Sequence, residues 1–95
     1  MAVKVIIPTP LRQYTGRSDS VVVDGKTVEE VLGNLTSQYG DLRKHLYSED
    51  GKLRSFVNIY RNDEDIRYLE KEKTAVREND VLSIVPSIAG GSQLR

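Results

Sequence analysis

Residues 27–40 read TVEEVLGNLTSQYG, and this stretch carries the clearest secondary-structure signal in the chain. Thr27 and Glu30 have the spacing of a capping box, in which the Thr hydroxyl accepts from the N3 amide while the Glu side chain reaches back to the cap. Apolar residues then recur on one helical stripe: Val28, Val31, Leu32, Leu35 and Tyr39. The stretch therefore predicts an amphipathic helix that begins after Thr27 and ends at Gly40, a residue suited to a left-handed terminator.

Short β-branched segments before this helix predict two strands. Residues 2–7 are followed by Pro8 and Pro10, and residues 20–23 end at the turn pair Asp24-Gly25. Together they suggest an N-terminal hairpin. Its long connection, residues 8–18, is expected to be a surface loop.

The second half of the chain predicts more strands after one or two helical turns at residues 41–47. Residues 56–60 form the third strand, and Arg61 to Glu64 supply turn chemistry before a short strand at residues 66–68. The last strand, residues 81–85, ends at Pro86. Within it Leu82 and Ile84 alternate with polar or outward positions, so we expect both to face the core.

This order of elements predicts the α+β class, with one mixed sheet of four to five strands packed on one main helix. If the first and last strands lie side by side in the middle of the sheet, the arrangement is the β-grasp, or ubiquitin-like, fold. The pattern allows that pairing without proving it. We expect residues 1–86 to form this domain and residues 87–95 to form a flexible tail.

Composition narrows the function. The 95 residues (10.7 kDa) have a mean hydropathy of −0.45 and no Cys, and 14 Lys and Arg balance 14 Asp and Glu. No net positive field favours nucleic acid, no apolar run is long enough to span a membrane, and no thiolate is present for catalysis or metal binding. We therefore expect a cytoplasmic protein with neither nucleic-acid nor membrane partners, no metal and no cofactor of its own.

Candidate catalytic groups are few. The residues at 62–65, Asn-Asp-Glu-Asp, resemble an acidic cluster but are interpreted as a hairpin turn, because consecutive turn residues point apart. His45, the only histidine, is expected on the outer side of a helical turn, without a nucleophile or acid as partner. The chain is therefore predicted not to be an enzyme.

The final residues, Ser87-Ile88-Ala89-Gly90-Gly91-Ser92-Gln93-Leu94-Arg95, are too short and too small to add another packed element. From Ser87 to Gly91 an extended chain spans about 16–18 Å, at roughly 3.3–3.6 Å per residue. Gly90 and Gly91 carry no Cβ and can pass a narrow channel. The tail thus has the reach and slenderness needed to enter another protein's active site.

The segment from Glu78 to Gly91 resembles the closing signature of MoaD/ThiS sulfur carriers. The long run at 56–67, FVNIYRNDEDIR, and the short motifs at 7–9, 11–12, 15–16 and 51–53 resemble the CysO-type carriers of cysteine biosynthesis. The resemblance covers nearly the whole chain. It implies a β-grasp protein that is a substrate and carrier for partner enzymes.

The resemblance also implies the chemistry. An E1-like adenylyltransferase would use ATP to activate the carboxylate of Gly91, and sulfide or a persulfide would then displace AMP to leave a thiocarboxylate. Gly90 and Ala89 would give the reacting glycine access to the partner's channel. The acceptor would be a PLP-dependent cysteine synthase-like enzyme, followed by proteolytic release of cysteine.

Three positions depart from the family pattern. Asn79 stands where glycine is common, and Ser87 replaces a frequent proline. The third departure matters most, because Ser92 to Arg95 follow Gly91 and leave no carboxylate there to adenylate. We expect a JAMM-type metalloprotease to cut between Gly91 and Ser92. A tail added in cloning is the alternative.

Partner contacts are expected near the tail. Val85 and Ile88 are candidates for an apolar docking patch, although Val85 could simply cover a sheet edge. Arg12 and Arg17 are candidates for pairing with an acidic partner surface, although loop arginines are often only solvated. The alternative functions are the small subunit of molybdopterin synthase and a ubiquitin-like protein modifier or binding module.

Overall fold

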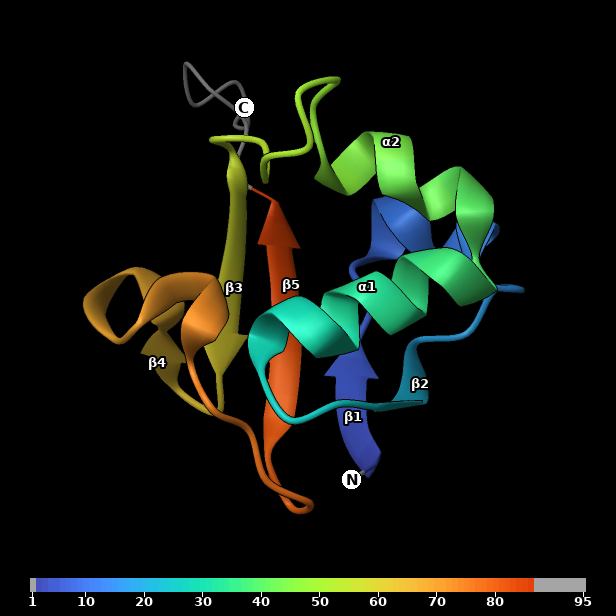
Figure 1. Cartoon of the computed structure of the whole chain (residues 1–95). Coiled ribbons are helices and arrows are strands. Elements are labelled where there is room, and N and C mark those ends of the chain that lie inside the picture. The colour runs from blue at the N-terminus through green and yellow to red at the C-terminus, as the bar shows by residue number, and fades with distance from the viewer. Residues whose placement is uncertain (1, 87–95) are drawn as a thin grey trace, which may run out of the picture.

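The computed structural model describes residues 2–86 (Figure 1). The strands and α-helices, in chain order, are β1 (Ala2–Ile6), β2 (Ser20–Asp24), α1 (Val28–Gln38), α2 (Arg43–Leu46), β3 (Val57–Arg61), β4 (Glu64–Asp65) and β5 (Val81–Pro86). Four short 3-10 helices connect them: η1 (Thr9–Tyr14), η2 (Gly40–Leu42), η3 (Ile66–Tyr68) and η4 (Lys71–Lys73). No helix within residues 2–86 is long and apolar enough to cross a membrane.

The strands form one mixed sheet in the order β2-β1-β5-β3-β4. The first and last strands are parallel neighbours in its middle, with Val5 opposite Leu82. Every other pairing is antiparallel. The expected β-grasp arrangement is therefore confirmed, including the N-terminal hairpin and the central position of β5.

Helix α1 begins as its sequence predicts. The hydroxyl of Thr27 accepts a hydrogen bond from the backbone N–H of Glu30 at 3.2 Å. The Glu30 carboxylate accepts in return from the backbone N–H of Lys26 at 3.0 Å, so both halves of the capping box are present. Gly40 does not end the helix in a left-handed conformation as predicted. The last helical residue is Gln38, and Gly40 opens η2, which brings the fully buried Leu42 under the sheet.

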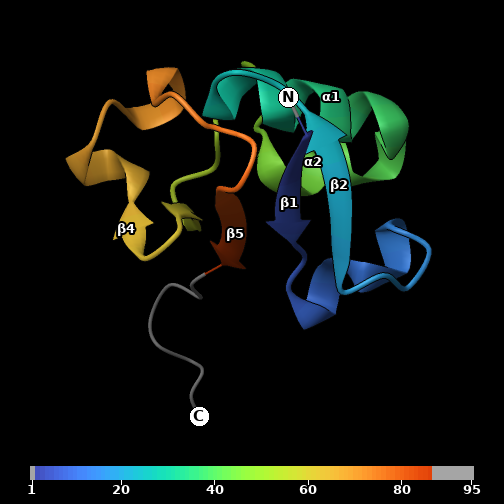
Figure 2. The same ribbon diagram turned by 90° about the horizontal axis from the view of Figure 1, so that it is seen from below.

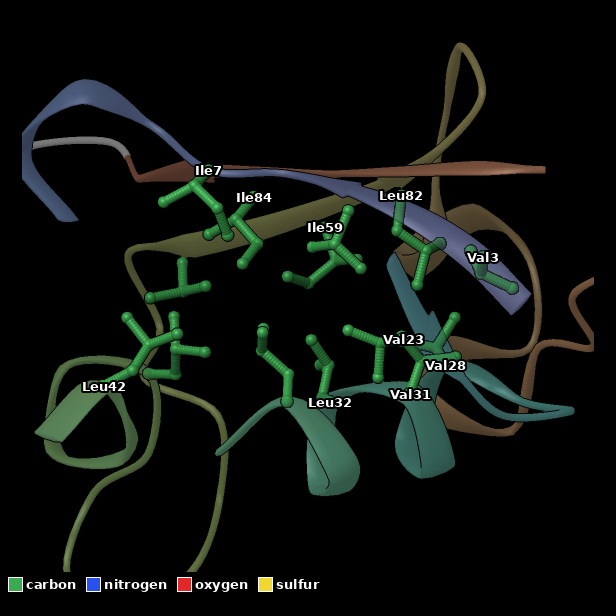
Figure 3. Packing of buried hydrophobic residues seen from close by; sticks show 14 of the residues in the cluster. Val3, Ile7, Val23, Val28, Val31, Leu32, Leu42, Ile59, Leu82 and Ile84 are labelled. Atoms are coloured by element: carbon green, nitrogen blue, oxygen red, sulfur yellow. The ribbon is translucent and has the colours of Figure 1, made fainter. Parts of the chain in front are cut away.

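The core lies between the sheet and the helices, which cover one of its faces (Figures 2 and 3). Leu82 and Ile84 of β5 are 0% and 2% exposed, as predicted. They meet the buried stripe of α1 across the layer. The remaining fully buried residues from the sheet and the helical layer include Val3, Val5, Ile7, Val28, Val31, Leu32, Leu35, Leu42 and Leu46.

The connection expected to be a surface loop contains a 3-10 helix. Pro8 is its N-cap residue, with φ −69°, and Pro10 follows within the first turn. Proline fits the start of a helix because its φ is already close to the helical value and no N–H is needed there. Leu11 buries its side chain and anchors η1 to the core.

The short strand of the second hairpin lies earlier than predicted. Residues 66–68 form η3, and the strand is β4, only two residues long. The reason is local: the Asp65 carboxylate accepts from the backbone N–H of Arg67 at 2.9 Å and so caps a helical turn where the strand would continue. The turn at Asn62-Asp63 is as expected, with Asn62 at φ 58°.

Candidate functional site

The end of β5 leads toward the predicted reactive residues. Ile88, Ala89, Gly90, Gly91 and Ser92 all lie outside the described residues. The structure therefore gives the position of β5, the strand that precedes these residues in the chain. That strand runs through the middle of the sheet and ends at Pro86, whose register partner on β3 is Val57.

Val85 faces away from the core. Because side chains alternate along a strand, the burial of Leu82 and Ile84 directs Val85 to the face that lacks α1 and α2. Its side chain is 42% exposed. Val22 on β2 shares that face and is 66% exposed, with Lys4 as its register partner on β1. We call the face that carries Val22, Lys4, Asn58 and Val85 the open face of the sheet.

A guanidinium lies beside the register partner of Val85 on this face. Asn58 is the register partner of Val85, and its side-chain oxygen accepts from the guanidinium of Arg67. The same guanidinium donates to the Asp65 carboxylate at 2.9 Å. The side-chain hydrogen bonds between Arg67 and Asp65 lower the pKa of Asp65 and raise that of Arg67. Arg67 was not among the site residues predicted from the sequence. Asp65, two positions before it, is the sequence signal for this ion pair.

The two candidate arginines lie in the connection that leaves β1. Because β1 and β5 are parallel, this connection starts at the end of the sheet where β5 also ends. The Arg12 Nε donates to the carbonyl of Ile7 at 3.0 Å, so part of this side chain holds the loop together. Arg17 is exposed and has φ 66°, in a tight turn with Gly16. Of the two, Arg17 is the more accessible.

His45 is not on the outer side of its helix, as expected from the sequence. Its ring stacks on Tyr14 with a centroid distance of 4.3 Å, and its Nε2 is buried without a hydrogen-bond partner among the described residues. The prediction was wrong because η1 folds over α2 and supplies Tyr14. In this position His45 is a packing residue.

Residues 62–65 form the turn and the short strand of the second hairpin, and their polar side chains hold that hairpin together. Asn62 donates to the Asp80 carboxylate at 3.1 Å, and its side-chain oxygen accepts from the backbone N–H of Val81 at 3.0 Å. The Asp65 carboxylate is committed to Arg67. Within residues 2–86 no group of three or more His, Asp or Glu side chains is placed to hold a metal ion.

The mixed sheet with its central parallel pair and covering helix defines a ubiquitin-like β-grasp protein. Residues 5–91 match the model of the ThiS family. The chain belongs to the ThiS family, which confirms the resemblance seen in its closing residues. The match ends at Gly91, so Ser92 to Arg95 lie beyond it.

Individual relatives agree with this assignment. The chain is 43% identical over 93 residues to "Sulfur carrier protein CysO" of Mycobacterium tuberculosis, across 96% of this chain and 100% of the relative. A chain in the crystal structure of the Amycolatopsis orientalis BexX/CysO complex superposes with a TM-score of 0.85 at 41% identity, across 95% of this chain and 100% of that one. "Small archaeal modifier protein 3" of Haloferax volcanii is 36% identical over 70 residues, or 74% of this chain and 75% of the relative.

Proposed function

We propose that this chain is a sulfur carrier of the CysO type, which delivers sulfur for cysteine biosynthesis from a thiocarboxylate on Gly91. One observation carries the proposal: the family match runs over residues 5–91 and stops at the second glycine. The similarity to proteins named as CysO sulfur carriers, over nearly the whole chain, supports the same function.

The proposed chemistry begins with hydrolysis, because Gly91 as written has its carbonyl in a peptide bond to Ser92. A JAMM-type metalloprotease would use water to cleave that bond, which frees the carboxylate and releases the residues from Ser92 to Arg95. The carboxylate then attacks the α-phosphorus of ATP in an E1-like partner and expels pyrophosphate. Hydrosulfide attacks the resulting acyl adenylate and expels AMP, which leaves the thiocarboxylate.

The carrier itself supplies binding and positioning, while the partners perform catalysis. Val85 and Arg67 lie on the open face, beside the strand that ends five residues before Gly91. We assign the part of this face around Val85 and Arg67 to docking on the activating enzyme, with Ile88 and Arg17 as further contacts. ATP belongs to that enzyme, and PLP to the cysteine synthase-like acceptor.

Intact-mass spectrometry of the protein from its native cells tests the proposal. Under sulfur limitation we expect a chain that ends at Gly91, with a fraction heavier by the exchange of one oxygen for sulfur. A Gly91→Ala variant is expected to lose the heavier species. Recovery of the full-length chain alone, under these conditions, would contradict the proposal.

A second candidate is a protein modifier joined to lysine side chains through Gly91. The similarity to Small archaeal modifier protein 3 favours it. In that case slowly migrating conjugates would appear in the native cells and vanish when Gly90 and Gly91 are deleted. Thiocarboxylate without conjugates would favour the carrier.

A further inference from the structure

Strand β3 has one side that is only partly paired. It pairs with β5 along its whole length but with β4 only at Tyr60 and Arg61. The backbone N–H of Asn62 donates to Val81 across the β3–β5 ladder, so the antiparallel alternation directs the main-chain groups of Val57 and Ile59 away from β5. On that side the Val57 N–H already donates to the Arg54 carbonyl at 3.0 Å. No strand within residues 2–86 pairs with Val57 or Ile59 on that side.

A hollow of about 310 Å³ lies along this side of β3. Its floor is apolar and consists of Val57, Ile59 and Ile66, which are 7%, 1% and 3% exposed. η3 and η4 stand beside β3, as Figure 1 shows, and contribute to the wall. The volume is at the lower end of the range that ligand pockets occupy. We call this hollow the β3 groove.

The rim of the β3 groove is cationic. Arg54, Arg67 and Lys71 line it, together with Glu72. Because Arg67 is already paired with Asp65, Arg54 and Lys71 are the cations left for a ligand. A neighbouring hollow of about 410 Å³ shares Arg54 and adds Arg43 and Lys44, against Glu49. The chain as a whole has no net charge, so this excess is local. A polyanion such as nucleic acid needs positive charge over a large area, whereas a short acidic segment needs only a small group of cations such as this one.

We propose that the β3 groove binds an extended segment of a partner protein in which apolar side chains are flanked by Asp or Glu. The Val57 carbonyl and the Ile59 main chain lie on the partly paired side of β3 and offer a short main-chain edge to the segment. The floor accepts the apolar side chains of the segment, and Arg54 and Lys71 pair with its acids. Val57 is the register partner of Pro86, so the groove begins where β5 ends. A partner held there lies next to the start of the tail. The proposal does not depend on sulfur transfer.

The test is a titration of the full-length chain with the synthetic peptide acetyl-Glu-Asp-Ile-Val-Ile-Asp-Glu-amide, followed by backbone amide shifts in NMR spectra. We expect saturable shifts centred on Val57, Ile59 and Ile66. The same peptide with Lys at every acidic position should bind about fivefold or more weakly, because it would face the cations of Arg54 and Lys71.

Lys71→Asp provides the matched variant. Lys71 is exposed and has φ 55°, a conformation that Asp tolerates, so reversal of its charge should leave the fold intact. We expect it to weaken binding of the acidic peptide about fivefold or more. Lys73→Asp, an equal change in charge outside the groove, should alter binding by less than about twofold.

Ser55→Trp tests the apolar part without a change of charge. Ser55 is exposed and lines the groove, so the indole is expected to obstruct it and abolish the shifts. Absence of saturable binding, equal binding of the two peptides, or shifts centred on Val22 and Val85 would each overturn the proposal. Shifts of the groove amides with protein concentration alone would overturn it too, because the occupant would then be a second copy of this chain.

Discussion

Arg67 holds Asp65 by two separate groups. The Nη2 atom of Arg67 donates to one carboxylate oxygen of Asp65 at 2.9 Å, and its backbone N–H donates to the other at 2.9 Å. The Asp65 side chain is 7% exposed, whereas that of Arg67 is 56% exposed. This pair ends β4, starts η3 and fixes a cation beside Asn58 on the open face.

The pair makes stability depend on pH. Because the folded state lowers the pKa of Asp65, the ionised carboxylate stabilises the native state. That contribution is fully present above the ordinary Asp pKa of about 3.9 and is lost as the pH falls through the lower folded value. We expect Asp65→Asn to lower Tm by a few degrees at about pH 7 and by less at about pH 2.5. Asp63→Asn in the same hairpin, at an exposed position, is the control; an equal loss at both pH values would contradict the account.

Asn62 combines an unusual backbone conformation with two side-chain hydrogen bonds. Asn62→Gly removes the hydrogen bonds and keeps the positive φ accessible, at an expected cost of about 1 kcal/mol. Asn62→Ala adds the strain of a positive φ, for a total of about 2 kcal/mol. Urea unfolding would measure both free energies. Equal losses would show that the backbone conformation contributes nothing.

Two glycines should respond oppositely to alanine. A Cβ on Gly25 would lie 2.6 Å from the Val31 Cγ2 and 2.7 Å from the Val31 backbone nitrogen, so Gly25→Ala is expected to cost about 1–3 kcal/mol. A Cβ on Gly33, within α1, would meet nothing within 4 Å. Gly33→Ala should stabilise the fold by about 0.5–1 kcal/mol, because alanine favours the helix. Thermal unfolding of both variants checks the two signs.

The open face can be tested at Val85. If it docks on the activating enzyme, Val85→Asp should reduce ATP–pyrophosphate exchange about tenfold or more, since a carboxylate would be buried against a partner. Val22→Asp, on the same face but on the edge strand, should change it by less than about twofold. The assay uses the chain trimmed after Gly91 and its cognate enzyme. A loss of less than about twofold for Val85→Asp would remove Val85 from the interface.

Much of the fold was predictable because its signals are local. The capping box and apolar stripe located α1, and the alternation of Leu82, Ser83 and Ile84 gave the face of β5 correctly. The errors came where two local tendencies compete. Asp65 can continue a strand or cap a turn, and only its bond to the Arg67 N–H decided for the turn. Gly40 suits a helix terminus, but the burial of Leu42 continued the chain into η2.

The candidate site was less predictable because it depends on contacts between distant segments. Val85 followed from strand alternation alone. Arg67 beside Asn58, and the β3 groove between residues 53–59 and 66–72, exist only because β4 is short and η3 and η4 fold back beside β3. The stacking of His45 on Tyr14 likewise joins two segments that no periodic pattern links.

The parallel pairing of β1 with β5 also sets the order of events during synthesis. The ribosome makes Val5 with the first strand, yet its partner Leu82 follows only after the other strands and both α-helices have been made. The middle of the sheet therefore closes last, and a nascent chain arrested before β5 would leave the apolar side chains of β1 and α1 uncovered. Only a chain that already includes β5 can close the middle of the sheet.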